Sequence, residues 1–315
     1  MYLVTGASGF IGNALVKRLI KDGLPPTLAI RNLDCNVDLG CNTFKILDLG
    51  GEIDWSSSLV GIKYVIHCAG RAHIMNDNAL DPLLEFRRVN VFGTLNLAKQ
   101  AAASGVSRFI FISTIKVNGD STEIGLPYTE NSIPKPADPY AVSKLEAEEG
   151  LFRIAIQTGM EVVVIRPTLV YGNGVKGNFL VMMNWLGKGF PLPFGGINNL
   201  RSFIGIDNFV DLIITCLHHP SAANEIFLAA DGEDISTSEL LRRISFLMGK
   251  TNTLIYVPTS LIRAIAFAMG RVELTRRLYG SLQVDISKSK ERLGWTPPIS
   301  MEQGLERMIH CRFSE

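Results

Sequence analysis

The segment Thr5-Gly6-Ala7-Ser8-Gly9-Phe10-Ile11-Gly12 follows a short apolar run, Tyr2–Thr5, at the start of the chain. Its three glycines permit a tight turn and let the backbone approach a phosphate group closely. A helix expected at Ile11–Lys21 begins there, and its first N–H groups have no partner inside the helix. The segment therefore predicts a strand–turn–helix unit that binds a pyrophosphate; the alternative is an ordinary glycine-rich turn, which seldom shows so regular a spacing.

Beyond this segment, short β-branched runs alternate with longer helical patterns, as in parallel βαβ units. The expected strands are Tyr2–Thr5, Thr27–Arg31, Thr43–Leu47, Tyr64–Cys68, Phe109–Ser113 and Val162–Arg166. The expected helices are Ile11–Lys21, Pro82–Ala103 and Pro139–Thr158. Asp81 and Asp138 each place a capping carboxylate before a proline at the first helical position. The alternation predicts an α/β fold with a doubly wound parallel sheet.

The regular alternation stops after Arg166. Residues 167–200 are rich in glycine and proline, whereas a helix near Asn208–Leu217 and a strand near Glu225–Ala229 restore the pattern. Short helices follow, and two of them are announced by capping boxes, Ser236-x-x-Glu239 and Ser300-x-x-Gln303. We expect a dinucleotide-binding domain at 1–166 plus about 201–234. A smaller C-terminal substrate-binding domain is expected at about 167–200 plus 235–315.

The bulk composition narrows the class of protein. The 315 residues carry a net charge of +1, which gives no reason to expect nucleic acid, since that partner favours a clustered basic face. The sequence shows no secretory signal and no run of about 18 apolar residues that could span a bilayer. Its five cysteines lack a CxxC pair. This predicts reduced thiols in a cytoplasmic protein with no metal site and no membrane partner.

A tyrosine and a lysine in Tyr140-x-x-x-Lys144 lie one turn apart on one face of the helix that starts after Asp138. An ammonium near a phenol favours the phenolate, so we expect Lys144 to lower the pKa of Tyr140 for proton exchange. A hydroxyl at the end of the preceding strand should complete this group, and the sequence offers Ser113 and Thr114. The pattern predicts an acid–base site.

The sequence TGASGFIG at 5–12, together with Tyr140-x-x-x-Lys144, resembles the extended branch of the short-chain dehydrogenase/reductase superfamily. The resemblance is to its NAD-dependent epimerase/dehydratase family, which includes UDP-glucose 4-epimerases, and it covers essentially the whole chain. It implies a Rossmann-type fold in which Thr114, aligned on Val117-Asn118-Gly119, is the catalytic hydroxyl, and Ser113 is a neighbour bonded to backbone. Tyr140 would take the proton of a sugar hydroxyl, commonly at C4, while the nicotinamide accepts the hydride. Lys144 would hold the cofactor ribose.

The same resemblance implies a cofactor site. Its residues would be Gly6, Ser8, Gly9, Phe10, Ile11, Gly12, Arg31, Asp48, Leu49, Ala69, Tyr140 and Lys144. The related epimerases have an acidic residue where Arg31 stands, and an arginine there accommodates the 2′-phosphate of NADP. Arg31 thus favours NADP and the resemblance to epimerases favours NAD, so both cofactors stay open.

The substrate implied by the resemblance is a nucleotide-sugar, UDP-linked in the epimerases. Asn178 matches an asparagine that contacts it, and Arg201 matches an arginine that meets its diphosphate, with Arg276 or Arg277 as a second cation. Asn90 matches an asparagine with a mainly structural role. The helices that begin at Pro82 and Pro139 form a dimer interface in relatives, which implies a homodimer.

Two positions narrow the reaction. Related 4,6-dehydratases carry Asp-Glu directly after the catalytic threonine, and this chain has Ile115 and Lys116 there, so elimination lacks its acid and base. The leading hypothesis is an NAD(P)-dependent nucleotide-sugar 4-epimerase. The alternatives are a 4-keto reductase of surface-polysaccharide biosynthesis, which Arg31 favours, and a non-catalytic NADP-binding protein, which the intact Thr114, Tyr140 and Lys144 set disfavours.

Overall fold

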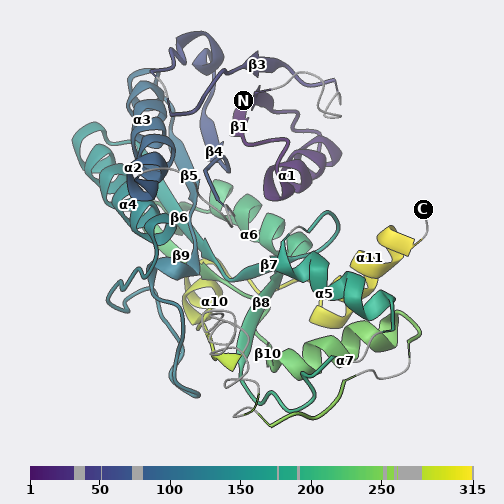
Figure 1. Cartoon of the computed structure of the whole chain (residues 1–315). Coiled ribbons are helices and arrows are strands. Elements are labelled where there is room, and N and C mark those ends of the chain that lie inside the picture. The colour runs from purple at the N-terminus through teal and green to yellow at the C-terminus, as the bar shows by residue number, and fades with distance from the viewer. Residues whose placement is uncertain are drawn as a thin grey trace.

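Within the residues that the computed structural model describes, the centre of the protein is a parallel sheet of seven strands (Figure 1). The described residues are 1–31, 40–50, 52–72, 81–175, 177–189, 192–250, 254–258, 261 and 279–313. The strands are β1 (Tyr2–Thr5), β2 (Thr27–Ile30), β3 (Thr43–Lys45), β4 (Tyr64–His67), β5 (Arg108–Ile112), β6 (Glu161–Pro167) and β9 (Glu225–Ala229). Their order in the sheet is β3-β2-β1-β4-β5-β6-β9. The order reverses between β1 and β4, which makes that point the crevice where a doubly wound sheet binds ligands.

Helices cover both faces of this sheet. On one face lie α1 (Phe10–Lys21) and α6 (Ile206–His218), and on the other α3 (Thr94–Ala103) and α4 (Pro139–Thr158). Successive residues of one strand enter different cores, because side chains alternate across a strand: Val4 packs with α1 and Leu3 packs with α3. The predicted α/β fold with a doubly wound parallel sheet is confirmed.

The helix expected at Pro82–Ala103 is interrupted. It consists of α2 (Pro82–Arg87), a π-helical segment η2 (Arg88–Gly93) and α3. Such wider turns are rare and leave no mark on the hydrophobic spacing of a sequence. The expected caps are present, because the Asp81 carboxylate accepts from the Leu84 N–H at 3.0 Å and the Asp138 carboxylate from the Ala141 N–H at 2.8 Å.

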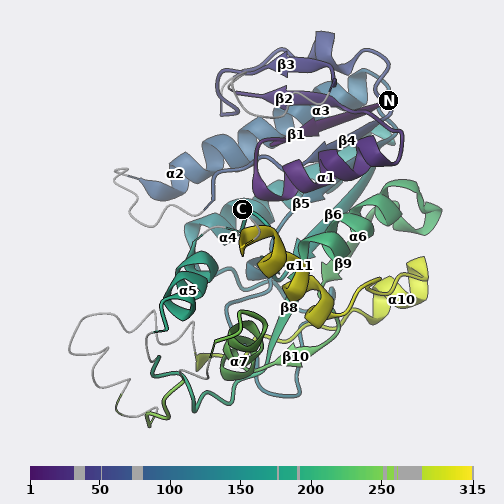
Figure 2. The same cartoon turned by 90° about the vertical axis from the view of Figure 1, so that its right-hand side faces the viewer.

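A smaller sheet, β10-β8-β7, stands at the carboxyl ends of the large one (Figure 2). Its strands are β7 (Leu169–Tyr171), β8 (Arg201–Gly205) and β10 (Asp234–Ile235), and α5 (Asn178–Gly187), α7 (Thr237–Leu247) and α11 (Met301–Phe313) pack around it. The remaining short elements are η1 (Ser56–Leu59), η3 (Ile115–Val117), η4 (Pro220–Ala222) and α10 (Ser287–Leu293). The chain crosses between the two sheets repeatedly, since β8 joins the small sheet and α6 and β9 return to the large one. The proposed division into two domains stays a prediction.

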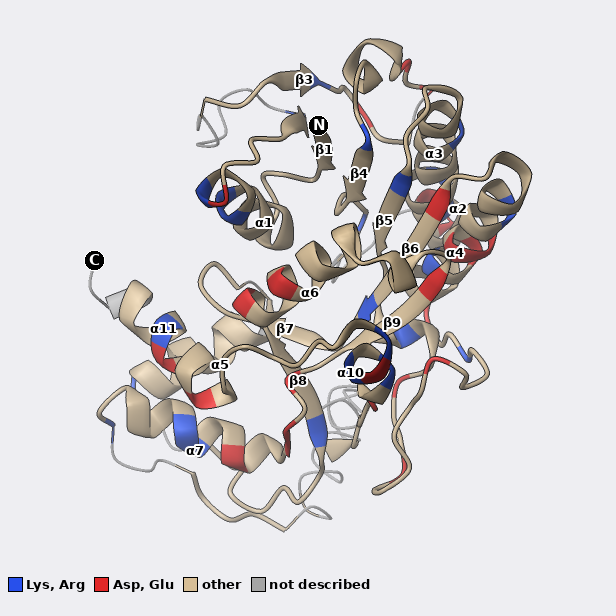
Figure 3. Ribbon diagram, turned by 180° about the vertical axis from the view of Figure 1, so that it is seen from behind, with Lys and Arg blue, Asp and Glu red and all other residues tan. Residues whose placement is uncertain are grey.

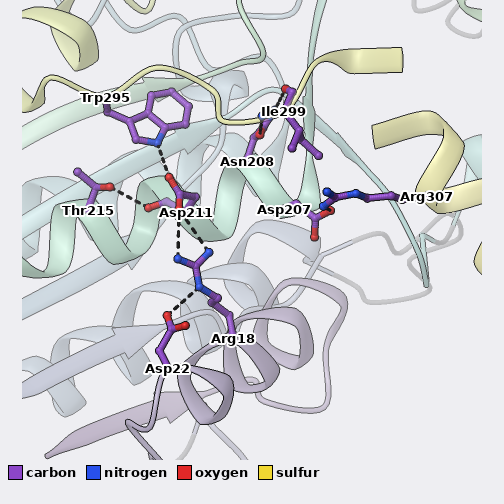
Figure 4. Close-up of polar contacts among 9 residues, drawn as sticks. All are labelled: Arg18, Asp22, Asp207, Asn208, Asp211, Thr215, Trp295, Ile299 and Arg307. Carbon is purple, nitrogen blue, oxygen red and sulfur yellow. Dashed lines mark hydrogen bonds and ion pairs between the residues drawn. The ribbon is translucent and has the colours of Figure 1, made fainter. Parts of the chain in front are cut away.

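The C-terminal segment is bonded back onto α6, which is in turn bonded to α1 (Figure 4). Trp295 donates its indole N–H to Asp211 at 3.0 Å, and Arg18 of α1 lies 3.3 Å from the same carboxylate. The Asn208 side chain exchanges two hydrogen bonds with the backbone of Ile299, at 2.9 and 3.1 Å. These contacts fix the start of α11, where Ser300 and Gln303 form the expected capping box.

Charged residues of both signs are interspersed on the ribbon, as along α4 and α10 in Figure 3. Among the helices of the described residues, none has the length and apolar character needed to cross a membrane.

Candidate active site

The glycine segment forms a tight turn between β1 and α1. Gly6 has φ +70°, and a Cβ there would lie 2.7 Å from the Ala69 nitrogen, at the crevice between β1 and β4. A Cβ on Gly12 would lie 2.1 Å from the Gly6 carbonyl oxygen, so only glycine fits at either position. The N-cap of α1, Gly9, brings no side-chain hydrogen bond, and the first turn of this described helix contains no acidic residue. The turn thus presents backbone N–H groups that fit a pyrophosphate.

A second corner of the site lies where β2 and β3 end. The Asp48 carboxylate accepts a hydrogen bond from the Arg88 guanidinium and another from the Gly50 N–H at 3.1 Å. The Arg88 hydrogen bond lowers the pKa of Asp48, and the charge of Arg31 lowers it further. Arg31 and Asp48 therefore lie at one corner, next to buried Leu49, where the sequence predicted contacts to the adenosine part of the cofactor.

The proposed catalytic residues gather at the carboxyl end of β5. Thr114 follows this strand as the N-cap of η3, Tyr140 lies in the first turn of α4, and Lys144 lies one turn later. The Lys144 ammonium donates to the Ile112 carbonyl oxygen at 2.7 Å and lies 4.2 Å from the centroid of the Phe111 ring. Lys144 is thereby anchored to the strand that leads to Thr114.

Burial dominates the acid–base properties of this site. Burial lowers the pKa of Lys144 to about 8, although the charge of Glu148 opposes the shift. Burial also raises the pKa of Tyr140, and the Asp138 carboxylate raises it further. The expectation that Lys144 lowers the pKa of this phenol is wrong, because burial and Asp138 set the direction of the shift and the Lys144 ammonium is bonded to the Ile112 carbonyl. The phenol of this site is thus protonated.

Comparisons with known proteins identify the family. The profile of the NAD dependent epimerase/dehydratase family matches residues 2–230. The chain belongs to this family. A UDP-glucose 4-epimerase from Vibrio cholerae is 46% identical over 307 residues, which cover 97% of this chain and 93% of that protein. A GDP-6-deoxy-D-mannose reductase from Pseudomonas aeruginosa is 28% identical over 315 residues, covering 97% of this chain and 95% of that one.

A crystal structure of UDP-glucose 4-epimerase with UDP-glucose from Thermotoga maritima has the same fold. Its TM-score with this protein is 0.80 at 24% identity, and the match covers 100% of this chain and 99% of that chain. The expected resemblance to an NAD-dependent enzyme of the extended short-chain dehydrogenase/reductase type is confirmed. The individual roles of the site residues stay predictions for this member of the epimerase/dehydratase family.

A buried ionic cluster that the sequence did not predict lies one helical turn along α4 from the proposed catalytic residues of this epimerase/dehydratase family member. Glu148, one turn after Lys144 on α4, pairs with Arg166 of β6 at 2.5 Å, and both side chains are almost fully buried. The Ser113 hydroxyl donates to Glu148, not to backbone as expected. Asn118 accepts from Arg166 at 2.9 Å. A glutamate at i+4 from the lysine is the one local signal that could have indicated this cluster.

Asn90, in the π-helical segment, has the structural role expected from the family. Its amide nitrogen donates to the Ser143 hydroxyl at 3.0 Å and to the Arg71 carbonyl at 3.1 Å, and its oxygen accepts from the Arg71 N–H at 2.8 Å. It therefore ties the segment after β4 to α4.

The substrate side of this family member is described in part. Arg201 begins β8 and donates to the Gly280 carbonyl at 2.8 Å, and burial lowers its pKa. Asn178 begins α5, but its side chain lies outside the described part. Arg276 also lies outside the described residues. Of the three residues proposed to contact the substrate, the structure thus describes the side chain of Arg201 alone, and the three contacts stay predictions.

Proposed function

We propose that this protein is a nucleotide-sugar 4-epimerase that retains NAD and interconverts C4 epimers of a UDP-hexose or UDP-N-acetylhexosamine. The observation that carries the proposal is the 46% identity, over nearly the full length, to the V. cholerae UDP-glucose 4-epimerase. The arrangement of Thr114, Tyr140 and Lys144 at one end of the large sheet supports it.

The residues present fit NAD. Backbone N–H groups at Phe10–Gly12, in the first turn of α1, would hold the pyrophosphate. Asp48 and Leu49 would contact the adenosine end, and Ala69 would lie beside the nicotinamide. When bound, NAD supplies the group that takes a hydride from a sugar carbon and returns it.

In the proposed reaction the protein moves one proton and fixes the reacting oxygen. Tyr140, in its phenolate form, accepts the proton of the C4 hydroxyl and returns it when the sugar carbon is reduced again. Thr114 donates a hydrogen bond to the same oxygen. Lys144 positions the cofactor ribose from its anchor on Ile112. Because burial favours the protonated phenol, removal of the substrate proton requires positive charge near Tyr140.

The positions after Thr114 support epimerisation over elimination. Ile115 is buried, and Lys116 forms an ion pair with Asp138. Neither side chain can act as the carboxylic acid or carboxylate that removal of water from the sugar needs.

Conversion of UDP-glucose to UDP-galactose, followed by proton NMR, tests the proposal. We expect Tyr140→Phe to lower kcat by about 10²–10⁴-fold, since the phenol exchanges the proton. The variant should keep NAD binding, because its ring still packs against Phe86, 6.0 Å away between centroids. Full turnover in Tyr140→Phe would show that the proposed mechanism is wrong.

A 4-keto reductase is the second candidate. The likeness to the P. aeruginosa reductase and the position of Arg31 beside Asp48 favour it. Denaturation of the purified protein separates the two candidates. Release of stoichiometric NAD supports the epimerase, whereas an empty site that binds NADPH in preference to NADH, and loses this preference in Arg31→Ala, supports the reductase.

We infer a homodimer formed by the helices that begin at Pro82 and Pro139. Apolar side chains on this side are exposed in the single chain: Leu84 is 54%, Phe92 57% and Ile156 85% exposed. Light scattering that gives the mass of one chain would contradict this assembly.

The four described cysteines are free thiols, which supports a cytoplasmic location.

A further inference from the structure

An ion pair joins the two elements that carry the proposed catalytic residues. The Lys116 ammonium lies 2.5 Å from the Asp138 carboxylate, and the side chains are 33% and 26% exposed. Lys116 lies in η3, two residues after Thr114, and Asp138 lies two residues before Tyr140 as the N-cap of α4. The pair therefore links the segment that carries the Thr114 hydroxyl to the helical turn that carries the Tyr140 phenol.

Both partners are fixed locally as well. The Lys116 N–H donates to the Thr114 hydroxyl oxygen at 3.3 Å, and the second carboxylate oxygen of Asp138 accepts from the Ala141 N–H at 2.8 Å. A movement of the ion pair would thus displace the end of β5 or the first turn of α4. Its geometry couples the position of Thr114 to that of Tyr140.

The pair also governs the charge near the phenol. Among the described residues, the charged and titratable groups on the elements packed near Tyr140 include Asp138, Lys144 and Glu148 of α4, Lys116 of η3, and Cys68 and Arg71 after β4. Asp138 raises the pKa of Tyr140, and the charge of Lys144 is held at the Ile112 carbonyl. Arg71 stacks 5.5 Å from the centroid of the Phe86 ring. Lys116 is the cation bonded to the carboxylate that opposes ionisation.

We propose that Lys116 is a positioning residue of this site: its ion pair with Asp138 holds η3 against the start of α4 and offsets the carboxylate charge beside Tyr140. A carboxylate at position 116 would repel Asp138. Lys116 thus leaves the site without a carboxylate for elimination at this position, and it supports proton exchange at C4. The importance of this role for turnover rests on the proposed function, whereas its effect on the phenol does not.

The test places 3,5-difluorotyrosine, whose phenol ionises nearer neutral pH, at position 140 of the full-length, ligand-free protein. Fluorine NMR then follows ionisation of this one phenol in four backgrounds: unchanged, Lys116→Met, Asp138→Asn and the double variant. Lys17→Met on α1 controls for the loss of one lysine charge. No substrate is needed, so the measurement stands even if the protein proves not to be an epimerase.

We expect Lys116→Met to raise the ionisation midpoint by about one pH unit, as for the loss of a close neutralising charge. Asp138→Asn should lower it, and the double variant should lie between the two single variants, because the two charges act on the phenol in opposite directions. With natural Tyr140, Lys116→Met should lower kcat on UDP-glucose about tenfold with KM nearly unchanged, while Lys116→Arg restores it. Equal midpoints in Lys116→Met and Lys17→Met would overturn the proposal. If Lys116→Met does not fold, an unchanged ionisation midpoint in folded Asp138→Asn would also overturn the proposal.

Discussion

Arg166 and Glu148 form an ion pair with 2.5 Å between nitrogen and oxygen, and their side chains are only 3% and 2% exposed. The pair lies between β6 and α4, on the same face of α4 as Tyr140 and Lys144 and one turn beyond the lysine. Ser113 donates to the same carboxylate. Two opposite charges at this depth are tolerated because each satisfies the other and because neutral polar groups complete their hydrogen bonds.

Removal of one partner of this buried pair should therefore lower the free energy of unfolding strongly. We expect Arg166→Leu to lower the free energy of unfolding by about 3–5 kcal/mol, because Glu148 would keep a buried charge without its partner. Urea denaturation measures the change. The exposed pair Arg307–Asp207, 59% and 49% exposed, is the control, and Arg307→Ala should cost at most about 1 kcal/mol. Equal costs would contradict the role given to burial.

Gly12→Ala should impair cofactor binding through the backbone. The added methyl would lie 2.1 Å from the Gly6 carbonyl oxygen, so α1 must move away from the phosphate turn. We expect the Kd for NAD, measured by calorimetry, to rise at least about tenfold, or about 1.4 kcal/mol. Gly187→Ala on α5 is the control, since this glycine has no positive φ and its added methyl would lie in ordinary contact with Met248, 3.4 Å away; it should leave the affinity unchanged. An unaltered Kd in Gly12→Ala would refute the close fit.

The loss of charge on Lys144 should make kcat/KM fall at alkaline pH. Burial lowers its pKa to about 8, so the side chain is charged below that pH and loses its proton as the pH rises through it. If the ammonium holds the cofactor ribose, kcat/KM declines over this interval. Lys144→Arg keeps its charge, and its residual activity should stay level there. A wild-type profile that remains flat well above pH 8 would count against this role.

The features that the sequence predicted well are local. Asp81 and Asp138 mark the starts of two helices, and alternating apolar runs mark the strands, because each signal lies within a few residues of the element that it specifies. The π-helical turn at Arg88–Gly93 has no such signal. The small sheet also escaped prediction, since β7, β8 and β10 lie in separate, glycine-interrupted parts of the chain.

The same distinction holds for the site. The glycine turn and Tyr140-x-x-x-Lys144 are contiguous motifs, so both could be found by inspection. The pairs Arg88–Asp48, Lys116–Asp138 and Arg166–Glu148 join elements that only the order of strands brings together. The pKa of Tyr140 was misjudged for a related reason: burial depends on the whole fold, whereas spacing shows only which charge is one turn away.

The most direct test of the account uses UDP-glucose with deuterium at C4 and the purified protein without added cofactor. The account predicts UDP-galactose that keeps the deuterium at C4, formed with a primary isotope effect on kcat, because the same hydrogen leaves and returns within one site. Loss of the label to solvent would contradict it. So would a protein that converts neither UDP-glucose nor UDP-N-acetylglucosamine and instead oxidises NADPH with a 4-keto sugar.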